Sequence, residues 1–235
     1  MRVRDLNWMQ LEEYLEHDDR VVMPLGSTEQ HAYLSLETDN ILAEGVSVEA
    51  AEPLGVPVLP VLPYGLTATF AAAYPGSPTL KLATYAALLR ELLDSLYGQR
   101  FRRFLIVNGH GGNTPAGSLA REWASEHPDA QALFHSWWAG PKVREVAEAI
   151  DPEYSHANWG ENFPWTRLPG VAAPEARKPM MNESAYMVAG PERLREVIGD
   201  GSFGGLYQRP DEEMQRIWDA GVAEVRELLE SGWRR

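Results

Sequence analysis

The sequence predicts an α/β protein in which helices cover both faces of a parallel sheet. Apolar runs typical of strands alternate with helical segments at regular intervals along the chain. Hydrophobic residues make up 44% of the 235 residues, which is enough for a sizeable core. No internal repeat, low-complexity tract or evident linker divides the chain. We therefore expect residues 1–235 to form a single domain.

Four strands are expected from short apolar runs bounded by residues that favour turns. In chain order they are residues 20–26, 56–62, 101–107 and 130–138. The first run is closed by Gly26, and the third contains four successive apolar residues from Phe104. Their alternation with helices is the pattern from which a parallel sheet is predicted.

The helices are expected from apolar spacing and from residues that start or stop a helix. Asp39 or Asn40 would cap the second helix, and Gly98 would stop the third. The expected helical segments are 6–16, 39–53, 84–97, one starting near 114 or 115, 141–150, one starting at 191, and a strongly amphipathic last helix at 210–229. Between them, 63–81 is predicted to be a long loop. Residues 151–181 are rich in proline and tryptophan, and a loop of that length is often a lid or pocket wall.

Charge and composition exclude several classes of protein. The chain has 21 basic and 34 acidic residues, and a net charge of -13 disfavours a nucleic-acid or anionic-membrane partner. Because there is no cysteine, there can be no disulfide, and any metal must be held by imidazole and carboxylate. The charged first 20 residues lack the apolar stretch of a secretory signal, and no segment has the apolar length that a bilayer requires. We expect a cytoplasmic protein.

Residues that can bind a metal lie just after the expected strands. The candidates are Glu29, His31 and Asp39 after the first strand, His110 after the third, and His156 and Glu161 in a later polar stretch. In a parallel sheet, sites form beyond the carboxyl ends of the strands, so these segments would converge at one edge. Zinc, manganese and iron(II) accept imidazole and carboxylate ligands, and a carboxylate such as Asp39 could bridge two ions.

Each segment taken alone has a simpler interpretation. Exposed glutamate and histidine are common on loops, so Glu29-Gln30-His31 by itself is weak evidence for a metal. The segment Asn108–Asn113 fits a tight turn or an anion cradle, although a plain turn does not need a central histidine and the Lys-Ser/Thr of a P-loop is missing. His156 could be a surface histidine and Glu161 a solvated carboxylate. Their shared position after strand ends favours a metal site.

A metal site of this kind predicts hydrolysis of an amide. A bound cation lowers the pKa of its water and polarises a carbonyl, and both effects are needed to attack an amide. A histidine near the metal suits protonation of the leaving nitrogen, since its pKa lies close to the working pH. A phosphoester substrate at the same dinuclear site is the alternative. The acidic charge and the lack of an Arg or Lys cluster beside the ligands argue against that alternative.

These residues make the chain resemble the creatininase (creatinine amidohydrolase) family. The motifs that carry the resemblance are Met23–His31, Leu36–Asp39, Pro63–Gly65, Pro75-Gly76, Asn108–Asn113, His156-Ala157 with Glu161, and Gly199–Gly201. The resemblance implies a three-layer α/β sandwich with a mostly parallel central sheet. It also implies two divalent ions, zinc or manganese with iron as an alternative, that hydrolyse a carbon–nitrogen bond in a small cyclic or linear amide. The usual assembly in the family is a homohexamer.

The resemblance also implies a role for each matching residue. The implied metal ligands are Glu29, His31, Asp39 as the bridge, His110 and Glu161. Creatininase itself has a glutamate two residues after the second histidine, where this chain has Gly112. Relatives with the glycine version use the later glutamate, so the resemblance implies Glu161 as the fifth ligand. His156 matches the position that shuttles a proton, so His156 and Glu161 are the expected catalytic residues.

Two departures from the family pattern shape the expected substrate. The loop from His31 to Asp39 is one residue shorter than usual, and a loop that fails to adjust would leave a non-catalytic binding protein with a degenerate metal site. The residues after Glu161 also differ, which argues against creatinine itself. The expected ligand is another small amide, with Trp159, Trp165 and Tyr64 as substrate-binding residues. As a group, tryptophans 137, 138, 159 and 165, with Phe163, are more often core or interface than ligand cage. His127 and His135 are expected to be structural.

Overall fold

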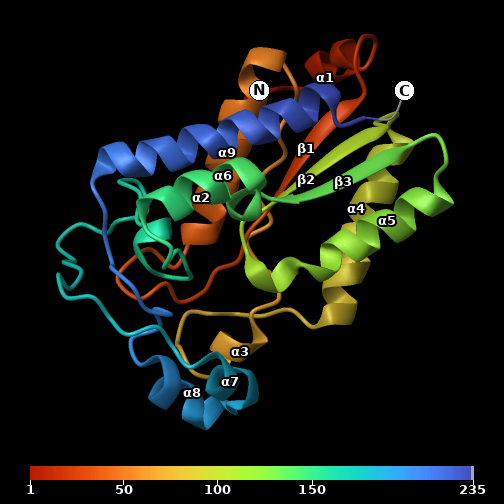
Figure 1. The fold of residues 1–235 in the computed structure, drawn as a ribbon. Coiled ribbons are helices and arrows are strands. Elements are labelled where there is room, and N and C mark those ends of the chain that lie inside the picture. Colours follow the sequence, from red (N-terminus) through yellow and green to blue (C-terminus); the bar gives the residue numbers. More distant parts are fainter. Residues whose placement is uncertain (234–235) are drawn as a thin grey trace.

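A parallel sheet forms the centre of the molecule in the computed structural model, which describes residues 1–233 (Figure 1). Its strands are β1 (Arg20–Leu25), β2 (Arg103–Asn108) and β3 (Gln131–Ser136), in the order β1-β2-β3. Both pairings are parallel, and the register aligns Leu25 with Asn108 and Asn108 with Ser136. The strands therefore end together at one edge of the sheet. This confirms the parallel arrangement predicted from the sequence.

The fourth expected strand, at residues 56–62, is not a regular strand. Isolated parallel bridges join Val58 to Val22 and Leu62 to Leu25, so the segment runs along β1 without a continuous ladder. Proline recurs at every third position from residue 57. Proline has no N–H to donate to a neighbouring strand, which explains why the apolar run forms only single bridges.

Nine α-helices surround the sheet in the described part of the chain. They are α1 (Trp8–Tyr14), α2 (Thr38–Ala51), α3 (Ala68–Ala71), α4 (Leu82–Gly98), α5 (Pro115–Glu126), α6 (Pro141–Ile150), α7 (Glu183–Val188), α8 (Pro191–Ile198) and α9 (Asp211–Ser231). Short 3-10 turns are η1 (Val3–Asp5), η2 (Glu52–Leu54), η3 (Gly111–Asn113), η4 (Trp137–Ala139) and η5 (Trp159–Glu161). No helix among residues 1–233 combines the length and the apolar character needed to cross a membrane.

Most helices agree with the expected segments, and the differences have local causes. Helix α6 has the predicted bounds, whereas α2 begins one residue early, so that Asp39 is its second residue and not its cap. Helix α3 lies inside the segment expected to be a loop, and α7 precedes the helix expected from Pro191. Both helices are short, and short helices depend on packing that sequence periodicity does not show.

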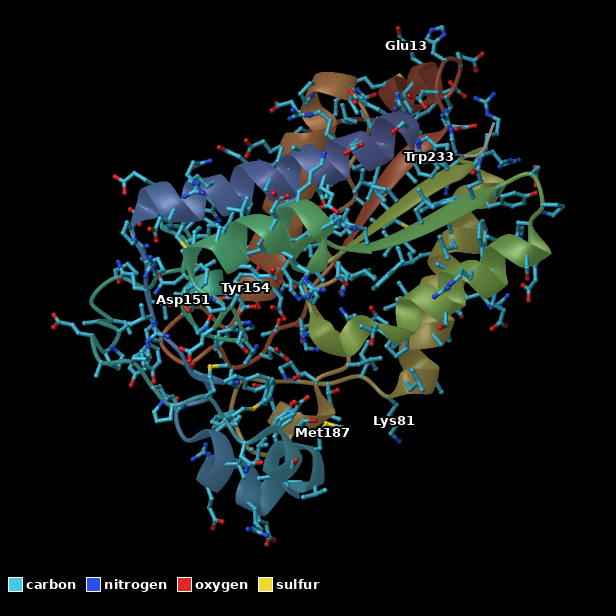
Figure 2. The ribbon with its side chains drawn as sticks, viewed as in Figure 1. Glu13, Lys81, Asp151, Tyr154, Met187 and Trp233 are labelled. Carbon is cyan, nitrogen blue, oxygen red and sulfur yellow. The ribbon has the colours of Figure 1, made fainter. Side chains whose placement is uncertain are left out.

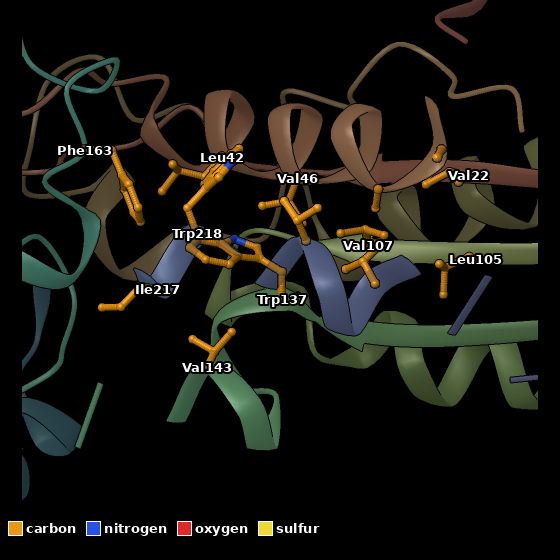
Figure 3. Close-up of a cluster of buried hydrophobic side chains, with 14 of the residues drawn as sticks. Val22, Leu42, Val46, Leu105, Val107, Trp137, Val143, Phe163, Ile217 and Trp218 are labelled. Carbon is orange, nitrogen blue, oxygen red and sulfur yellow. The ribbon is translucent and has the colours of Figure 1, made fainter. Parts of the chain in front are cut away.

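The helices form a layer on each face of the sheet. Alternate strand residues face opposite ways, so Val22 and Leu105 pack against α2, α6 and α9, and Val21 and Phe104 pack against α4 and α5. Figure 3 shows the first cluster, with Trp218 of α9 lying among side chains of α2, β2 and η4. Each large apolar side chain buried in this way stabilises the fold by about 1.5–3 kcal/mol. The result is a three-layer α/β sandwich.

A smaller group of helices lies beyond the carboxyl end of the sheet. Figure 1 shows α3, α7 and α8 together at this end, and their contact is a small apolar cluster around Phe70, Leu194 and Ile198. Met187 of α7 belongs to this group and is largely exposed (Figure 2). These helices stand opposite the strand ends, and a cavity lies between the two.

Candidate metal centre

Four of the candidate residues reach the same place because three chain segments meet beyond the strand ends. Glu29 and His31 follow β1, His110 follows β2, and Asp39 lies in the first turn of α2. The backbone N–H of Gly109 donates to the carbonyl of Leu25, which holds the two exits of the parallel strands together. This is the convergence predicted for the carboxyl edge of a parallel sheet.

Asp39 lies between two groups of ligand atoms. Its Oδ2 is 3.1 Å from Nδ1 of His110, and that nitrogen is 3.2 Å from Oε1 of Glu29. Its Oδ1 is 3.0 Å from Nε2 of His31, and that nitrogen is 3.6 Å from Oε2 of Glu161. Each carboxylate oxygen of Asp39 thus belongs to a different set of three ligand atoms. Such a division is what a carboxylate that bridges two cations requires.

Several of these atoms are buried without a hydrogen-bond partner. Glu29, His31 and Asp39 are almost completely buried, yet Oε2 of Glu29, Nε2 of His31 and Oδ2 of Asp39 accept or donate no hydrogen bond. An unpaired charge inside a protein is costly unless a counter-charge or a metal compensates it. The orphaned oxygen and nitrogen atoms therefore fit divalent cations, which would satisfy all three.

In two of the histidines, the ring nitrogen that faces away from the carboxylates is held by a backbone carbonyl. Nε2–H of His110 donates to the carbonyl of Leu66 over 3.1 Å, and Nδ1–H of His31 donates to the carbonyl of Glu29 over 3.1 Å. In a neutral imidazole this leaves the other nitrogen with a lone pair, here Nδ1 of His110 and Nε2 of His31. Both lone pairs face the carboxylates, as is usual for histidines that bind a metal.

In the metal-free protein, protons take the place of cations. Burial by itself lowers the pKa of His31, but the carboxylates of Asp39 and Glu161 raise that pKa to about 10. Burial likewise opposes a charged His110, but Glu29 and Asp39 raise the pKa of His110 well above its usual value. Burial raises the pKa of the Glu161 carboxyl to about 7. The carboxylates of the centre thus favour positive charge between them, as protons on the histidines or as bound cations.

The shortened loop does not separate His31 from Asp39. A tight turn follows His31, in which the N–H of Leu34 donates to the carbonyl of His31 and Ala32 adopts a φ of 50°. Backbone in this left-handed region is uncommon for alanine and marks a turn forced by its surroundings. Residues 31 to 39 therefore fold tightly enough for Asp39 to reach both histidines.

The centre opens into a cavity of about 410 Å³. Its wall includes Glu29, Asp39, His110, His156 and Glu161, together with aromatic side chains from several segments. These aromatic residues are Phe70, Trp138, Tyr154, Tyr186 and Phe203. No lysine or arginine is among the described residues that line the cavity.

His156 lies at the cavity side of the centre. Its Nδ1 is 3.9 Å from Oε1 of Glu29 and 3.9 Å from Oε2 of Glu161. Burial and the neighbouring His31 lower the pKa of His156 well below its usual value, so its ring is neutral. Of the expected catalytic residues, Glu161 therefore lies among the ligand atoms and His156 beside them.

The three residues expected to bind substrate lie elsewhere. Trp159 is fully buried in the core and donates its ring N–H to the carbonyl of Glu153. Trp165 is 41% exposed and stacks on Phe163, while Tyr64 is 52% exposed. None of the three is among the residues that line the cavity. The burial of Trp159 follows from the turn η5, which directs Glu161 toward the cavity and Trp159 into the core.

Trp138 lies in the cavity wall and was not among the expected substrate-binding residues. The expected strand 130–138 includes Trp138, but β3 ends at Ser136 and Trp138 lies in the turn η4 that follows it. With the strand ended at Ser136, its position after a strand end would have marked Trp138 as a candidate. Phe70, Tyr186 and Phe203 come from segments without clear periodicity. No motif in the sequence marks these three as cavity residues.

Comparisons with known proteins agree with this arrangement. A family model described as creatinine amidohydrolase matches residues 4–229. Over 118 residues the chain is 30% identical to a creatinine amidohydrolase from Pseudomonas putida, which covers 48% of this chain and 45% of that protein. Over 103 residues it is 36% identical to a mycofactocin precursor peptide peptidase from Mycolicibacterium smegmatis, which covers 41% of each. The aligned segments span less than half of the length of these curated relatives.

Solved structures are similar over the whole chain. A structure from Bacteroides fragilis, provisionally described as a creatinine amidohydrolase, is 25% identical with a TM-score of 0.77, and the match covers 100% of this chain and 98% of that one. A mutant creatininase of Zn-Zn type is 20% identical with a TM-score of 0.77 and the same coverage, and this likeness concerns the fold. Because the family model matches from residue 4 to residue 229, the chain belongs to the creatininase family.

Proposed function

We propose that this protein is a metal-dependent amidohydrolase that cleaves a carbon–nitrogen bond in a small cyclic or linear amide. The observation that carries the proposal is the position of Asp39, whose two carboxylate oxygens face two separate sets of ligand atoms. Membership of the creatininase family supports it, as do relatives described as a creatinine amidohydrolase and a peptide peptidase.

Two divalent ions fit the residues of the centre. Glu29, Asp39 and His110 would hold one ion, and His31, Asp39 and Glu161 would hold the other. Imidazole and carboxylate together suit zinc or manganese, with iron(II) as an alternative. Creatininases of Zn-Zn and Mn type are known among the similar folds. When bound, such ions polarise a carbonyl and lower the pKa of water.

The chain's own residues would orient the amide. The aromatic wall formed by Phe70, Trp138 and Phe203 excludes water and offers flat surfaces to a small planar amide. His156 lies within 3.9 Å of carboxylate oxygens of Glu29 and Glu161, at the mouth of the centre. We assign to His156 the hydrogen bond to the departing nitrogen that assists its protonation.

A phosphoester substrate is disfavoured by the charge of the cavity. Sites that bind phosphate usually supply arginine or lysine for the anionic oxygens, and none lines the cavity in the described part of the chain. A neutral amide does not need such a side chain.

We further propose that the protein works as a cytoplasmic homo-oligomer, with the hexamer as the expected form. Several large apolar side chains are exposed, among them Trp8 at 69% and Met187 at 74%, and such side chains commonly lie in subunit contacts. Light scattering of the purified protein would give the mass of the assembly. Cell fractionation would give its location.

The proposed activity can be tested with a substrate panel under controlled metal content. The purified chain would be stripped with chelator, reloaded with Zn²⁺ or Mn²⁺, and assayed on lactams, creatinine, formamides, short peptides and generic phosphoesters. We expect amide hydrolysis that is lost on chelation, restored by metal, and abolished in His110→Ala but kept in His17→Ala, an exposed control. Activity that persists after exhaustive chelation, or hydrolysis of phosphoesters alone, would contradict the proposal.

A further inference from the structure

The three histidines of the centre differ in what holds their outer ring nitrogen. His31 and His110 each donate an N–H to a backbone carbonyl, so the other nitrogen of each ring is the one that carries the lone pair when the ring is neutral. Nε2 of His156 instead lies 2.8 Å from the side-chain nitrogen Nε2 of Gln30. The hydrogen bond between these two nitrogens decides which nitrogen of His156 carries the proton.

The amide of Gln30 is held in one orientation by two backbone groups. Its Oε1 accepts from the N–H of Ala32 over 3.2 Å, and its Nε2 donates to the carbonyl of Gly201 over 3.0 Å. A backbone N–H can only donate and a carbonyl can only accept, so exchanging the amide oxygen and nitrogen would break both bonds. The side-chain group of Gln30 that faces His156 is therefore an amide N–H, which Nε2 of His156 accepts, and the backbone of Gln30 also contacts this ring.

Gly201 allows the Gln30 side chain to take this place. A β-carbon built on Gly201 would come within 1.7 Å of Oε1 of Gln30, and the φ of Gly201 is 105°, which favours glycine. The neighbouring Asp200 accepts hydrogen bonds from Nζ of Lys178 and from the hydroxyl of Tyr207, which fixes the loop. This is a structural reason for the Gly199–Gly201 motif, which lies far from the ligands in the sequence.

The plane of the His156 ring is fixed as well. Phe70 stacks on it with ring centroids 4.9 Å apart and an interplanar angle of 18°, and Phe203 lies at 4.9 Å. With Nε2 turned to Gln30, Nδ1 points toward the carboxylates of Glu29 and Glu161. Glu29, His31 and His156 are close enough together to form a third set of possible metal ligands.

We propose that Gln30 is a positioning residue that fixes His156 with its proton on Nδ1, so that His156 offers an N–H donor to the substrate and does not bind metal. A nitrogen that carries a proton has no lone pair for a cation, which sets His156 apart from His31 and His110. The part of this inference that concerns substrate rests on the proposed amidohydrolase function. The position of the proton on His156 does not depend on that function.

The position of the proton can be measured directly. Protein labelled with ¹⁵N in its six histidines would be studied by long-range ¹H–¹⁵N correlation, in the metal-free and the zinc-loaded form, with His156→Gln to assign the signals. We expect a neutral His156 with a protonated Nδ1 and an unprotonated Nε2 in both forms. A proton on Nε2 would mean that the ring donates outward, for example to the backbone carbonyl of Gln30, and would overturn the proposal.

A variant of Gln30 tests the positioning role. Gln30→Met keeps the length of the side chain and removes the amide, so we expect a rise in the Nε2–H tautomer of His156. The matched control is Gln208→Met at an exposed position, which should leave the His156 signals unchanged. An unchanged His156 tautomer in Gln30→Met would also overturn the proposal. If this variant fails to fold, the wild-type spectrum alone still decides.

Kinetics separate a positioning role from a general loss of structure. For an amide found active in the panel above, we expect Gln30→Met to lower kcat about 10- to 100-fold with KM and metal content largely unchanged. Loss of bound metal in this variant, with kcat per bound metal unchanged, would contradict the positioning role. If no amide is hydrolysed, the proposed function fails, but the tautomer measurement still judges the assignment of Gln30.

Discussion

Gly109 lies directly against the backbone carbonyl of Asp39. A β-carbon built on Gly109 would come within 2.4 Å of that oxygen, a distance that carbon atoms do not adopt. The contact joins the end of β2 to the first turn of α2, and so brings His110 and the Asp39 carboxylate to 3.1 Å. The absence of a side chain at one position thus sets the geometry of the proposed bridge.

Gly109→Ala is expected to weaken metal binding. The added methyl group would push α2 away from β2, lower metal affinity about tenfold or more, and cost roughly 1–3 kcal/mol of stability. The matched control is Gly111→Ala, because a β-carbon on Gly111 meets no atom within 4 Å. Titration with Mn²⁺ and thermal unfolding check both variants. Equal metal affinities for the two would show that the contact does not set the geometry.

Metal binding is expected to release protons. Because nearby carboxylates raise the pKa of His31 to about 10 and that of His110 well above its usual value, both rings are protonated at pH 7 without metal. Each must lose its proton to become a ligand, as must the fraction of Glu161 that is protonated, so at least two protons leave per chain, and metal affinity rises with pH. Calorimetry in buffers of different ionisation enthalpy measures this number. A binding enthalpy that does not depend on the buffer would contradict the prediction.

His135 is expected to reduce stability in acid. Burial lowers its pKa to about 4, and its Nε2 has no hydrogen-bond partner. The unfolded chain, with a pKa of about 6.5, binds the proton first, so the free energy of unfolding falls as the pH drops from 6.5 to 4. His135→Leu should remove roughly 2 kcal/mol of this loss at pH 4.5.

Denaturant unfolding at pH 7 and pH 4.5 measures the contribution of His135. The control is His17→Leu, at an exposed position, which should keep the wild-type dependence on pH. If His135→Leu loses as much stability in acid as the wild type, the buried imidazole is not the cause.

Trp138 is expected to affect substrate binding, whereas Trp165 is not. Trp138 lines the cavity, and Trp165 stacks on Phe163 away from it. Trp138→Ala should raise KM for an active amide about tenfold, as expected for one lost aromatic contact of 1–2 kcal/mol, with metal content unchanged. Trp165→Ala should change stability and leave KM alone. A larger rise in KM for Trp165→Ala than for Trp138→Ala would contradict this prediction and indicate that substrate binds at the exposed Trp165.

The sequence predicted the parts of the fold that depend on local pattern. The first and third expected strands each contain a short apolar run, Val21–Leu25 and Phe104–Val107. Helix 141–150 begins at a proline, so each of these elements has a signal within its own residues. The segment 56–62 is also apolar, but its prolines prevent a continuous ladder of backbone hydrogen bonds with β1. The short helices α3 and α7 depend on an apolar cluster in which Phe70 of α3 and Tyr186 of α7 pack with Leu194 and Ile198 of α8. No local sequence pattern predicts this packing.

The site divides in the same way. The convergence of Glu29, His31, Asp39 and His110 follows from parallel topology, which the sequence predicted. The direction of a side chain within a 3-10 turn does not follow from topology, so the sequence predicts substrate binding for Trp159, whereas the structure buries it in the core. Gln30 lies between two ligands in the sequence, yet its role depends on Gly201, 171 residues away along the chain.

Metal content tests the central claim most directly. The protein would be purified from medium supplemented with zinc and manganese, and its metal measured by elemental analysis beside Asp39→Asn and the exposed control Asp5→Asn. We expect about two ions per chain in the wild type and the control, and less than one in Asp39→Asn, because the amide cannot bridge as a carboxylate does. Only trace metal in the wild type, or two ions retained by Asp39→Asn, would contradict the account.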